Sequence, residues 1–116
     1  MATRAQIGIY TTAHSVKMIQ VAYEGYPSYT GALLKAHYNS LSKVKELMAK
    51  GNIMMLEENL EAIEQDSLIK TTKDERLVTN LGALESDVMV DYTYLFKEED
   101  KTWYILSQGK LVKCYL

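Results

Sequence analysis

With 116 residues, the chain has the length of one domain, 1–116, and can bury a core without disulfides or a metal. Hydrophobic residues make up 47% and charged residues 24%, which is typical of a globular protein. The formal net charge of −2 argues against a nucleic-acid partner, whose phosphates would favour a basic surface. No apolar run approaches the ~18 residues of a membrane span, and the lone Cys114 cannot form an internal disulfide. We therefore expect no membrane and a cytoplasmic location.

The first part of the chain predicts a hairpin of two strands, Thr3–Thr12 and Ser15–Glu24. In the first strand, Ala5, Ile7 and Ile9 alternate with residues that face the other way. The second strand is rich in β-branched residues, and the short polar segment between the two is typical of a hairpin turn.

A helical region follows the second strand. Pro27 cannot continue a strand ladder, and Ser28 or Thr30 can then cap a helix. Apolar residues recur at helical spacing from there to Gly51, a typical helix end. Ser40 interrupts the pattern, so we predict either two helices in tandem or one helix kinked at this residue.

The middle of the chain gives a weaker signal. Residues Met54–Gln65 have apolar side chains at helical spacing with glutamates on the other face, which predicts a third short helix. Residues 66–87 show no period and read as a loop, with a short strand around Leu77–Thr79.

The last third predicts three strands, Asp87–Phe96, Thr102–Ser107 and Lys110–Leu116, joined by tight turns. Strands at both ends of the chain with helices between them indicate the α+β class. We expect an antiparallel sheet of about five strands, with two or three helices grouped on one face.

No catalytic or metal-binding signature is present. His14 and His37 have no partner at the spacing of metal ligands, and Cys114 reads as a packed structural thiol. The glutamates after Met54 trace the polar face of the predicted helix, whereas catalytic carboxylates normally come from separate elements. We therefore expect no metal, no cofactor and no enzymatic activity.

The junction between the second strand and the first helix is the best candidate site. Tyrosines can stack on a flat ring, and a helix amino terminus attracts anions. Its predicted ligand-binding residues are Arg4, Tyr23, Glu24, Tyr26 and His37. Arg4 and the helix terminus would take negative charge, the tyrosines would stack, and Glu24 and His37 would offer polar contacts. The alternative is that Tyr26 and its neighbouring proline only plug the end of the core.

The chain resembles a family of short uncharacterised proteins of tailed bacteriophages and prophages. The resemblance covers the chain from its start to about Gly51, and again from Tyr94 to Tyr104. It departs from the family pattern where Tyr23-Glu24 replaces a Trp-Asp pair. The matching motifs are Thr3-Arg4, Ile7-Gly8-Ile9, Gly25-Tyr26-Pro27, Gly31, His37-Tyr38, Lys43-Val44, Gly51, Tyr94-Leu95-Phe96 and Trp103-Tyr104.

This resemblance implies a phage accessory protein in the cytoplasm of a bacterial host, acting by binding. Its expected role is host takeover or counter-defence, either by sequestering a nucleotide-like immune signal or by blocking a host defence protein. The alternative is a virion-associated or assembly protein, because the aromatic last strands can pair with another chain. A nucleotide hydrolase using Glu24 and His37 is a third hypothesis. We also expect a homo-oligomer, with the final strand at its seam.

Overall fold

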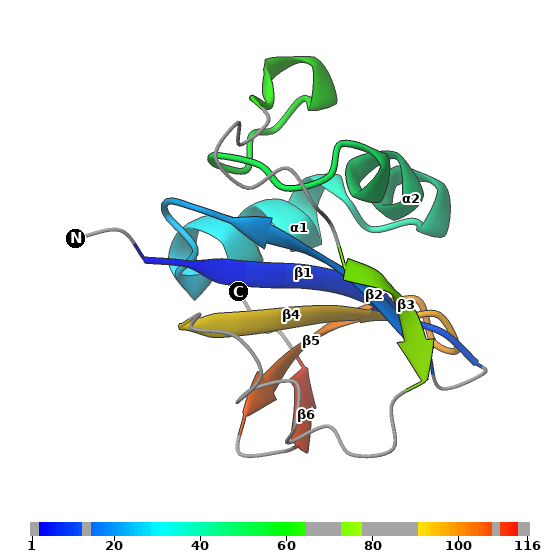
Figure 1. Cartoon of the computed structure of the whole chain (residues 1–116). Helices are drawn as coiled ribbons and strands as arrows, with labels where there is room; N and C mark the ends of the chain where they lie inside the picture. Colours follow the sequence, from blue (N-terminus) through cyan, green and yellow to red (C-terminus); the bar gives the residue numbers. More distant parts are fainter. Residues whose placement is uncertain (1–2, 13–14, 65–72, 78–90, 108–109, 114–116) are drawn as a thin grey trace.

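A computed structural model describes residues 3–12, 15–64, 73–77, 91–107 and 110–113 (Figure 1). A π-helical turn, Pro27–Gly31, runs directly into α1. The chain contains, in order, β1 (Ala5–Tyr10), β2 (Ser15–Val21), α1 (Ala32–His37), α2 (Leu41–Ala49), a 3₁₀ turn (Leu60–Ala62), β3 (Lys73–Leu77), β4 (Tyr92–Lys97), β5 (Thr102–Ser107) and β6 (Lys110–Lys113).

The strands form one six-stranded sheet in the order β3-β2-β1-β4-β5-β6. The α+β class is confirmed, but an antiparallel sheet was a wrong prediction, because β1 and β4 pair in parallel with Ala5 opposite Tyr92. After β2 the chain passes through the helices and then forms β3, which pairs antiparallel with β2, before β4 lies on the other side of β1 and runs in the same direction as β1. A crossover of this length permits a parallel pair, which a tight hairpin turn cannot make. The strand expected around Leu77–Thr79 lies earlier, at β3, and Thr79 is outside the described residues.

The main core lies between the sheet and the helices, which cover one face as predicted (Figure 1). Side chains alternate along a strand, so β1, β2, β4 and β5 each send residues of one face into this core. Its buried members are Ala5, Ile7, Ile9, Ile19, Val21, Leu34, Tyr38, Val44, Leu47, Met48, Ile53, Leu56, Ile63, Tyr94, Phe96 and Trp103. The indole N–H of Trp103 donates to the carbonyl of Tyr38 at 2.7 Å, which ties β5 to the end of α1.

Two tandem helices are confirmed, and Ser40 separates them. The Ser40 hydroxyl accepts from the Lys43 amide at 3.4 Å and caps α2, while Gly51 follows the helix with a positive φ of 74°. The cap predicted for the first helix is wrong, because the Thr30 hydroxyl donates to the carbonyl of Glu24 at 2.7 Å. No side-chain cap bond is present at Tyr26, where the helical segment begins.

The predicted third helix, Met54–Gln65, is also wrong over its described residues, which contain only the 3₁₀ turn. At the start of this segment the backbone pairs in parallel with the end of β2 instead of forming helical bonds: Ile53 donates to Gln20 at 2.9 Å, and Ala22 donates to Ile53 at 3.1 Å. Leu56 and Ile63 belong to this irregular loop, and their side chains are buried in the core. Tertiary burial and pairing with the strand therefore override the local helical spacing.

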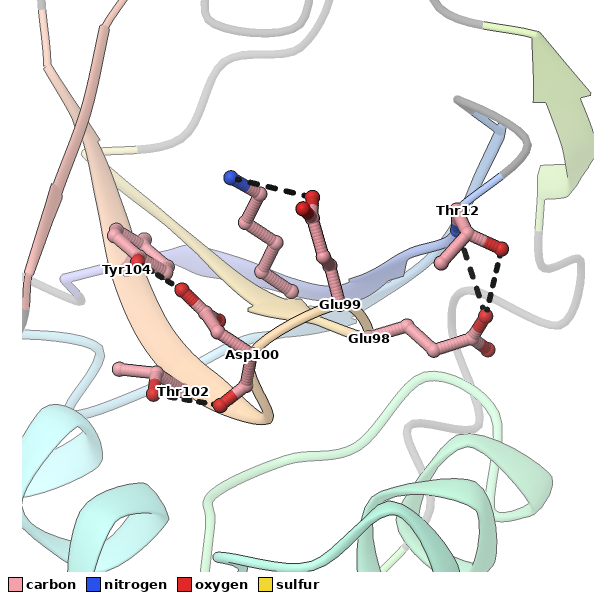
Figure 2. Close-up of polar contacts among 7 residues, drawn as sticks. Thr12, Glu98, Glu99, Asp100, Thr102 and Tyr104 are labelled. Atoms are coloured by element: carbon pink, nitrogen blue, oxygen red, sulfur yellow. Dashed lines mark hydrogen bonds and ion pairs between the residues drawn. The ribbon is translucent and has the colours of Figure 1, made fainter.

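The hairpin between β4 and β5 has an acidic turn in which Glu98, Glu99 and Asp100 each have a side-chain partner (Figure 2). Glu98 accepts from the Thr12 amide at 3.4 Å and from its hydroxyl at 3.3 Å. Glu99 lies 3.8 Å from the ammonium of Lys97, and Asp100 accepts from the Tyr104 hydroxyl. These contacts fix the turn and the neighbouring strand ends, and they explain its acidic composition structurally.

Candidate functional site

A pocket of about 470 Å³ lies at the opposite end of the sheet from the acidic hairpin, where β1 begins and β2 ends. This volume is within the range of pockets that bind small organic ligands. One wall is the continuation of β2, and the other is the loop that follows α2. The lining residues are Tyr23, Glu24, Met54, Met55, Glu57, Ala62 and Glu64.

Close backbone packing positions the first wall. The Gly25 amide donates to the carbonyl of Thr3 at 2.8 Å, and the buried Tyr94 hydroxyl donates to the carbonyl of Gly25 at 2.7 Å. A Cβ atom at Gly25 would lie 2.8 Å from the Cβ of Ala5 and 2.9 Å from the carbonyl carbon of Arg4. Glycine therefore permits the chain to pass directly against the start of β1.

Glu24, directly before this contact, has a φ of 57°, in the left-handed region that non-glycine residues rarely adopt. Its carboxylate Oε2 accepts from the hydroxyl of Tyr26. This hydrogen bond, burial and the negative charge of Glu24 all raise the pKa of Tyr26, which therefore stays a donor at neutral pH. Tyr26 in turn packs edge-on against Tyr29, with ring centroids 6.3 Å apart.

The second wall is a loop, Met54–Glu64, closed by its own backbone. The Met54 amide donates to the carbonyl of Glu64 at 2.9 Å, which joins the two ends of the loop. The Tyr23 amide donates to the carbonyl of Met54 at 2.8 Å and fixes the loop to the end of β2. Both walls are therefore held by backbone hydrogen bonds, so the pocket is preformed.

Tyrosine hydroxyls from the helical region hold the middle of the same loop. Tyr29 donates to the carbonyl of Leu56 at 2.9 Å and to the Glu57 carboxylate at 3.1 Å. Tyr38 donates to the carbonyl of Glu57 at 2.6 Å. Burial and the nearby Glu57 raise the pKa of both tyrosines, with burial the larger cause, so both hydroxyls remain protonated.

The pocket is acidic and partly apolar. Glu24, Glu57 and Glu64 line it together with Met54 and Met55. Within the described part of the chain, no ion pair joins a cation to any of the three pocket glutamates. Phosphate-bearing ligands would meet repulsion here, whereas a cation would neutralise the carboxylates.

The predicted site residues are only partly brought together. Tyr23 and Glu24 line the pocket, and Tyr26 supports Glu24 from beside it. The backbone of Arg4 lies against the following glycine, but its exposed side chain is not part of the lining. His37 is exposed at the far end of α1, roughly 15 Å along the helical segment at 1.5 Å per residue.

The predicted anion site is not formed as expected at the first helical turn. The amides of Tyr29 and Thr30 donate to the carbonyl of Tyr26 at 3.1 and 3.0 Å, so neither amide points freely outward. The carboxylate of Glu24 also lies beside this turn through its bond to Tyr26. Negative charge and occupied amides both oppose anion binding at this place.

Sequence reasoning missed the second wall of the pocket. The glutamates after Met54 were assigned to the solvated face of a helix, whereas Glu57 and Glu64 line the pocket. The sequence signal available was two adjacent methionines, Met54 and Met55, in front of an acidic run. Adjacent methionines at one face suit an adaptable binding surface, because the thioether chain is flexible and polarisable.

The three glutamates do not form a metal centre. Within the described part of the chain, no three His, Cys, Asp or Glu side chains are grouped so that they could hold a metal ion. None of the described helices is long and apolar enough to cross a membrane.

Comparison with known proteins adds no relative. No protein-family model matches the chain, and no curated protein or solved structure matches it either.

Proposed function

We propose that this protein acts by binding, and that the pocket between Tyr23-Glu24 and the loop Met54–Glu64 is its binding site. The carrying observation is a preformed pocket of about 470 Å³, lined by carboxylates and flexible apolar side chains. Tyrosine hydroxyls hold two of the elements that line it, so the site needs little reorganisation to bind.

The role we propose is counter-defence in the cytoplasm of a bacterial host, by blocking a host defence protein. The resemblance to phage proteins supports a role in counter-defence. The chemistry of the pocket supports the blocking of a host protein over the sequestering of a nucleotide-like signal. A nucleotide-like signal carries phosphates, which Glu24, Glu57 and Glu64 would repel. A host protein can instead present a basic side chain, which the same carboxylates attract.

The alternative role, in the virion or its assembly, rested on the aromatic faces of the last strands. In β4, Thr93, Tyr94, Leu95 and Phe96 are all buried, so neither face of this strand is available to another protein. The structural argument for that role is therefore reduced to the short edge strand β6.

Blocking the pocket tests the proposal. Ala62 is exposed and lines the pocket, so Ala62→Trp fills it, whereas Ala49→Trp places the same side chain on exposed α2 surface. Tagged protein is incubated with bacterial lysate, and bound species are quantified by mass spectrometry. We expect a bound protein that is lost with Ala62→Trp and retained with Ala49→Trp. Equal recovery of a bound protein by the native protein and both variants would refute a binding role for the pocket. Recovery of no bound species by the native protein would refute it as well.

A thermal-shift panel of cyclic nucleotides separates the two forms of the proposal. We expect no shift in melting temperature, because the pocket lacks a described cation to neutralise phosphate. A nucleotide that stabilises the native protein but not Ala62→Trp would favour sequestration of an immune signal over blockade of a protein.

A further inference from the structure

We propose that the pocket recognises an arginine side chain presented by an exposed segment of the partner protein. This inference rests on the proposed binding function and names the chemistry of its ligand. The evidence comes from three properties of the site: the free oxygens of its carboxylates, its apolar and aromatic lining, and the exposure of Tyr23 at its edge.

The carboxylates are oriented and still have capacity to bind. Glu24 uses Oε2 to accept from Tyr26, and Glu57 uses Oε1 to accept from Tyr29. No described donor bonds the other oxygen of either group, and no described donor bonds the carboxylate of Glu64, whose backbone carbonyl accepts from Met54. A guanidinium has five N–H donors in a planar fork, so it can reach more than one carboxylate at once.

The lining also suits the rest of an arginine side chain. Met54 and Met55 offer flexible apolar surface to the methylene stem. Tyr23 offers a ring on which a guanidinium plane can stack, an interaction that the compact ammonium of lysine makes less well. No three described His, Cys, Asp or Glu side chains are grouped to hold a metal ion, so an organic cation fits the acidic pocket better.

The exposure of the pocket edge indicates a protein as the source of the arginine. Tyr23 is 47% exposed, and among the described residues only it and Val112 are large hydrophobic residues left so exposed. Tyr and Met are enriched at the centres of protein interfaces. A partner segment that inserts arginine into the pocket would cover Tyr23 on more than the face that a free guanidinium stacks on, and would so bury more of its exposed surface.

The experiment titrates the native protein with the peptide acetyl-Gly-Gly-Arg-Gly-Gly-amide and follows backbone amides by NMR. The matched peptide carries citrulline, which has the shape of arginine without its charge. We expect the arginine peptide to shift the amides of Tyr23 and Met55. We expect the citrulline peptide to bind about tenfold more weakly, because charge-assisted hydrogen bonds are roughly twice as strong as neutral ones.

Glutamine substitutions locate the binding. Glu57→Gln and Glu64→Gln should each lower the affinity for the arginine peptide by about threefold, as expected for the loss of one partly solvated ion pair. Glu58→Gln is the control, because Glu58 is exposed and adjacent in sequence but does not line the pocket. Circular dichroism melting verifies that each variant is folded. Equal binding of both peptides, or unchanged affinity in both pocket variants, would overturn the inference.

Two further probes complete the test. The peptide with lysine in place of arginine should bind more weakly than the arginine peptide. Argininamide alone should also bind more weakly than the arginine peptide. If argininamide binds as tightly as the peptide, the inference that the arginine belongs to a partner protein is overturned. If the arginine peptide fails while a lysate protein still depends on an open pocket in the Ala62→Trp comparison, the inference fails and the proposed function stands. If that comparison also shows no bound species, the proposed function fails too.

Discussion

At the scale of single residues, Glu24 combines backbone strain with a position in the pocket. Its φ of 57° costs a residue with a Cβ atom about 1–2 kcal/mol relative to the right-handed region. Strain of this kind is often retained where it presents a functional group. Lys101 has a similar φ of 53° in the β4–β5 hairpin, away from the pocket. It therefore serves as the control for Glu24, because it has the same backbone strain without the position in the pocket.

Replacing each of these residues with glycine separates strain from function. We expect Glu24→Gly and Lys101→Gly to leave the free energy of unfolding unchanged or to raise it by up to about 1 kcal/mol, because glycine tolerates positive φ. Only Glu24→Gly should weaken binding of the arginine peptide. Urea unfolding and the NMR titration measure the two effects. A clear loss of stability in Glu24→Gly alone would show that its bond to Tyr26 outweighs the strain.

Gly25 is required by space rather than by φ. Gly25→Ala would place its Cβ 2.9 Å from both the carbonyl oxygen of Thr3 and the carbonyl carbon of Arg4, and this backbone cannot rotate away. We expect a loss of about 1–3 kcal/mol in the free energy of unfolding, the usual cost of overpacking. Thermal and urea unfolding measure it. Ser28→Ala, at an exposed position in the same segment, should change stability little. Equal stability of the two variants would contradict the close approach.

At the scale of elements, the pocket depends on how the loop Met54–Glu64 is attached to the helices. Tyr29 and Tyr38 donate to backbone carbonyls of this loop from two turns of the helical region. In the double variant Tyr29→Phe/Tyr38→Phe, hydrogen exchange of the loop amides should accelerate while the sheet amides remain protected. We expect a loss of about 0.5–1.5 kcal/mol in the free energy of unfolding for each hydrogen bond removed, because both bonds are only partly buried. Acceleration in the sheet as well would mean that the loop and the sheet unfold together.

The same tyrosines predict a dependence on alkaline pH. Burial and Glu57 raise the folded-state pKa of Tyr29 and Tyr38 above the ordinary tyrosine value of 10.0. Their contribution is therefore complete below pH 10.0 and decreases as the pH rises through the folded-state pKa values, because the unfolded chain loses these protons first. Urea unfolding at successive pH values should show a steeper alkaline decline for the native protein than for the double phenylalanine variant. Parallel declines would contradict this linkage.

Elements with strong local signals were predictable, and those that depend on distant contacts were not. Alternation placed Ala5, Ile7 and Ile9 on one face, and Ser40 marked the boundary between two helices, because local chemistry decides both features. The parallel pairing of β1 with β4 depends on the path of the whole crossover. The loop from Met54 has helical spacing, but its backbone bonds to the end of β2, which no local pattern indicates. The second half of the pocket was missed for this reason.

At the scale of the whole molecule, the sheet order separates three features. The pocket lies at one end of the strands and the acidic hairpin lies at the other. Among the described strands, β6 forms a lateral edge and pairs with β5. An edge strand leaves backbone donors and acceptors along one side, which can pair with another chain. Pairing through β6 would leave the pocket open, so self-association and binding of a partner are compatible.

The homo-oligomer expected from the sequence is best tested at this edge. Val112 in β6 is 50% exposed, and in an isologous dimer it would lie close to its own copy. Val112→Lys should therefore dissociate the dimer, because two lysines would face each other across the seam. Light scattering should give the mass of a dimer for the native protein and 13.2 kDa for this variant. Tyr23→Lys, at the other exposed hydrophobic residue, should remain a dimer. A native protein that is monomeric at high concentration would show that β6 does not pair, and dissociation by both variants would place the seam at the pocket end instead.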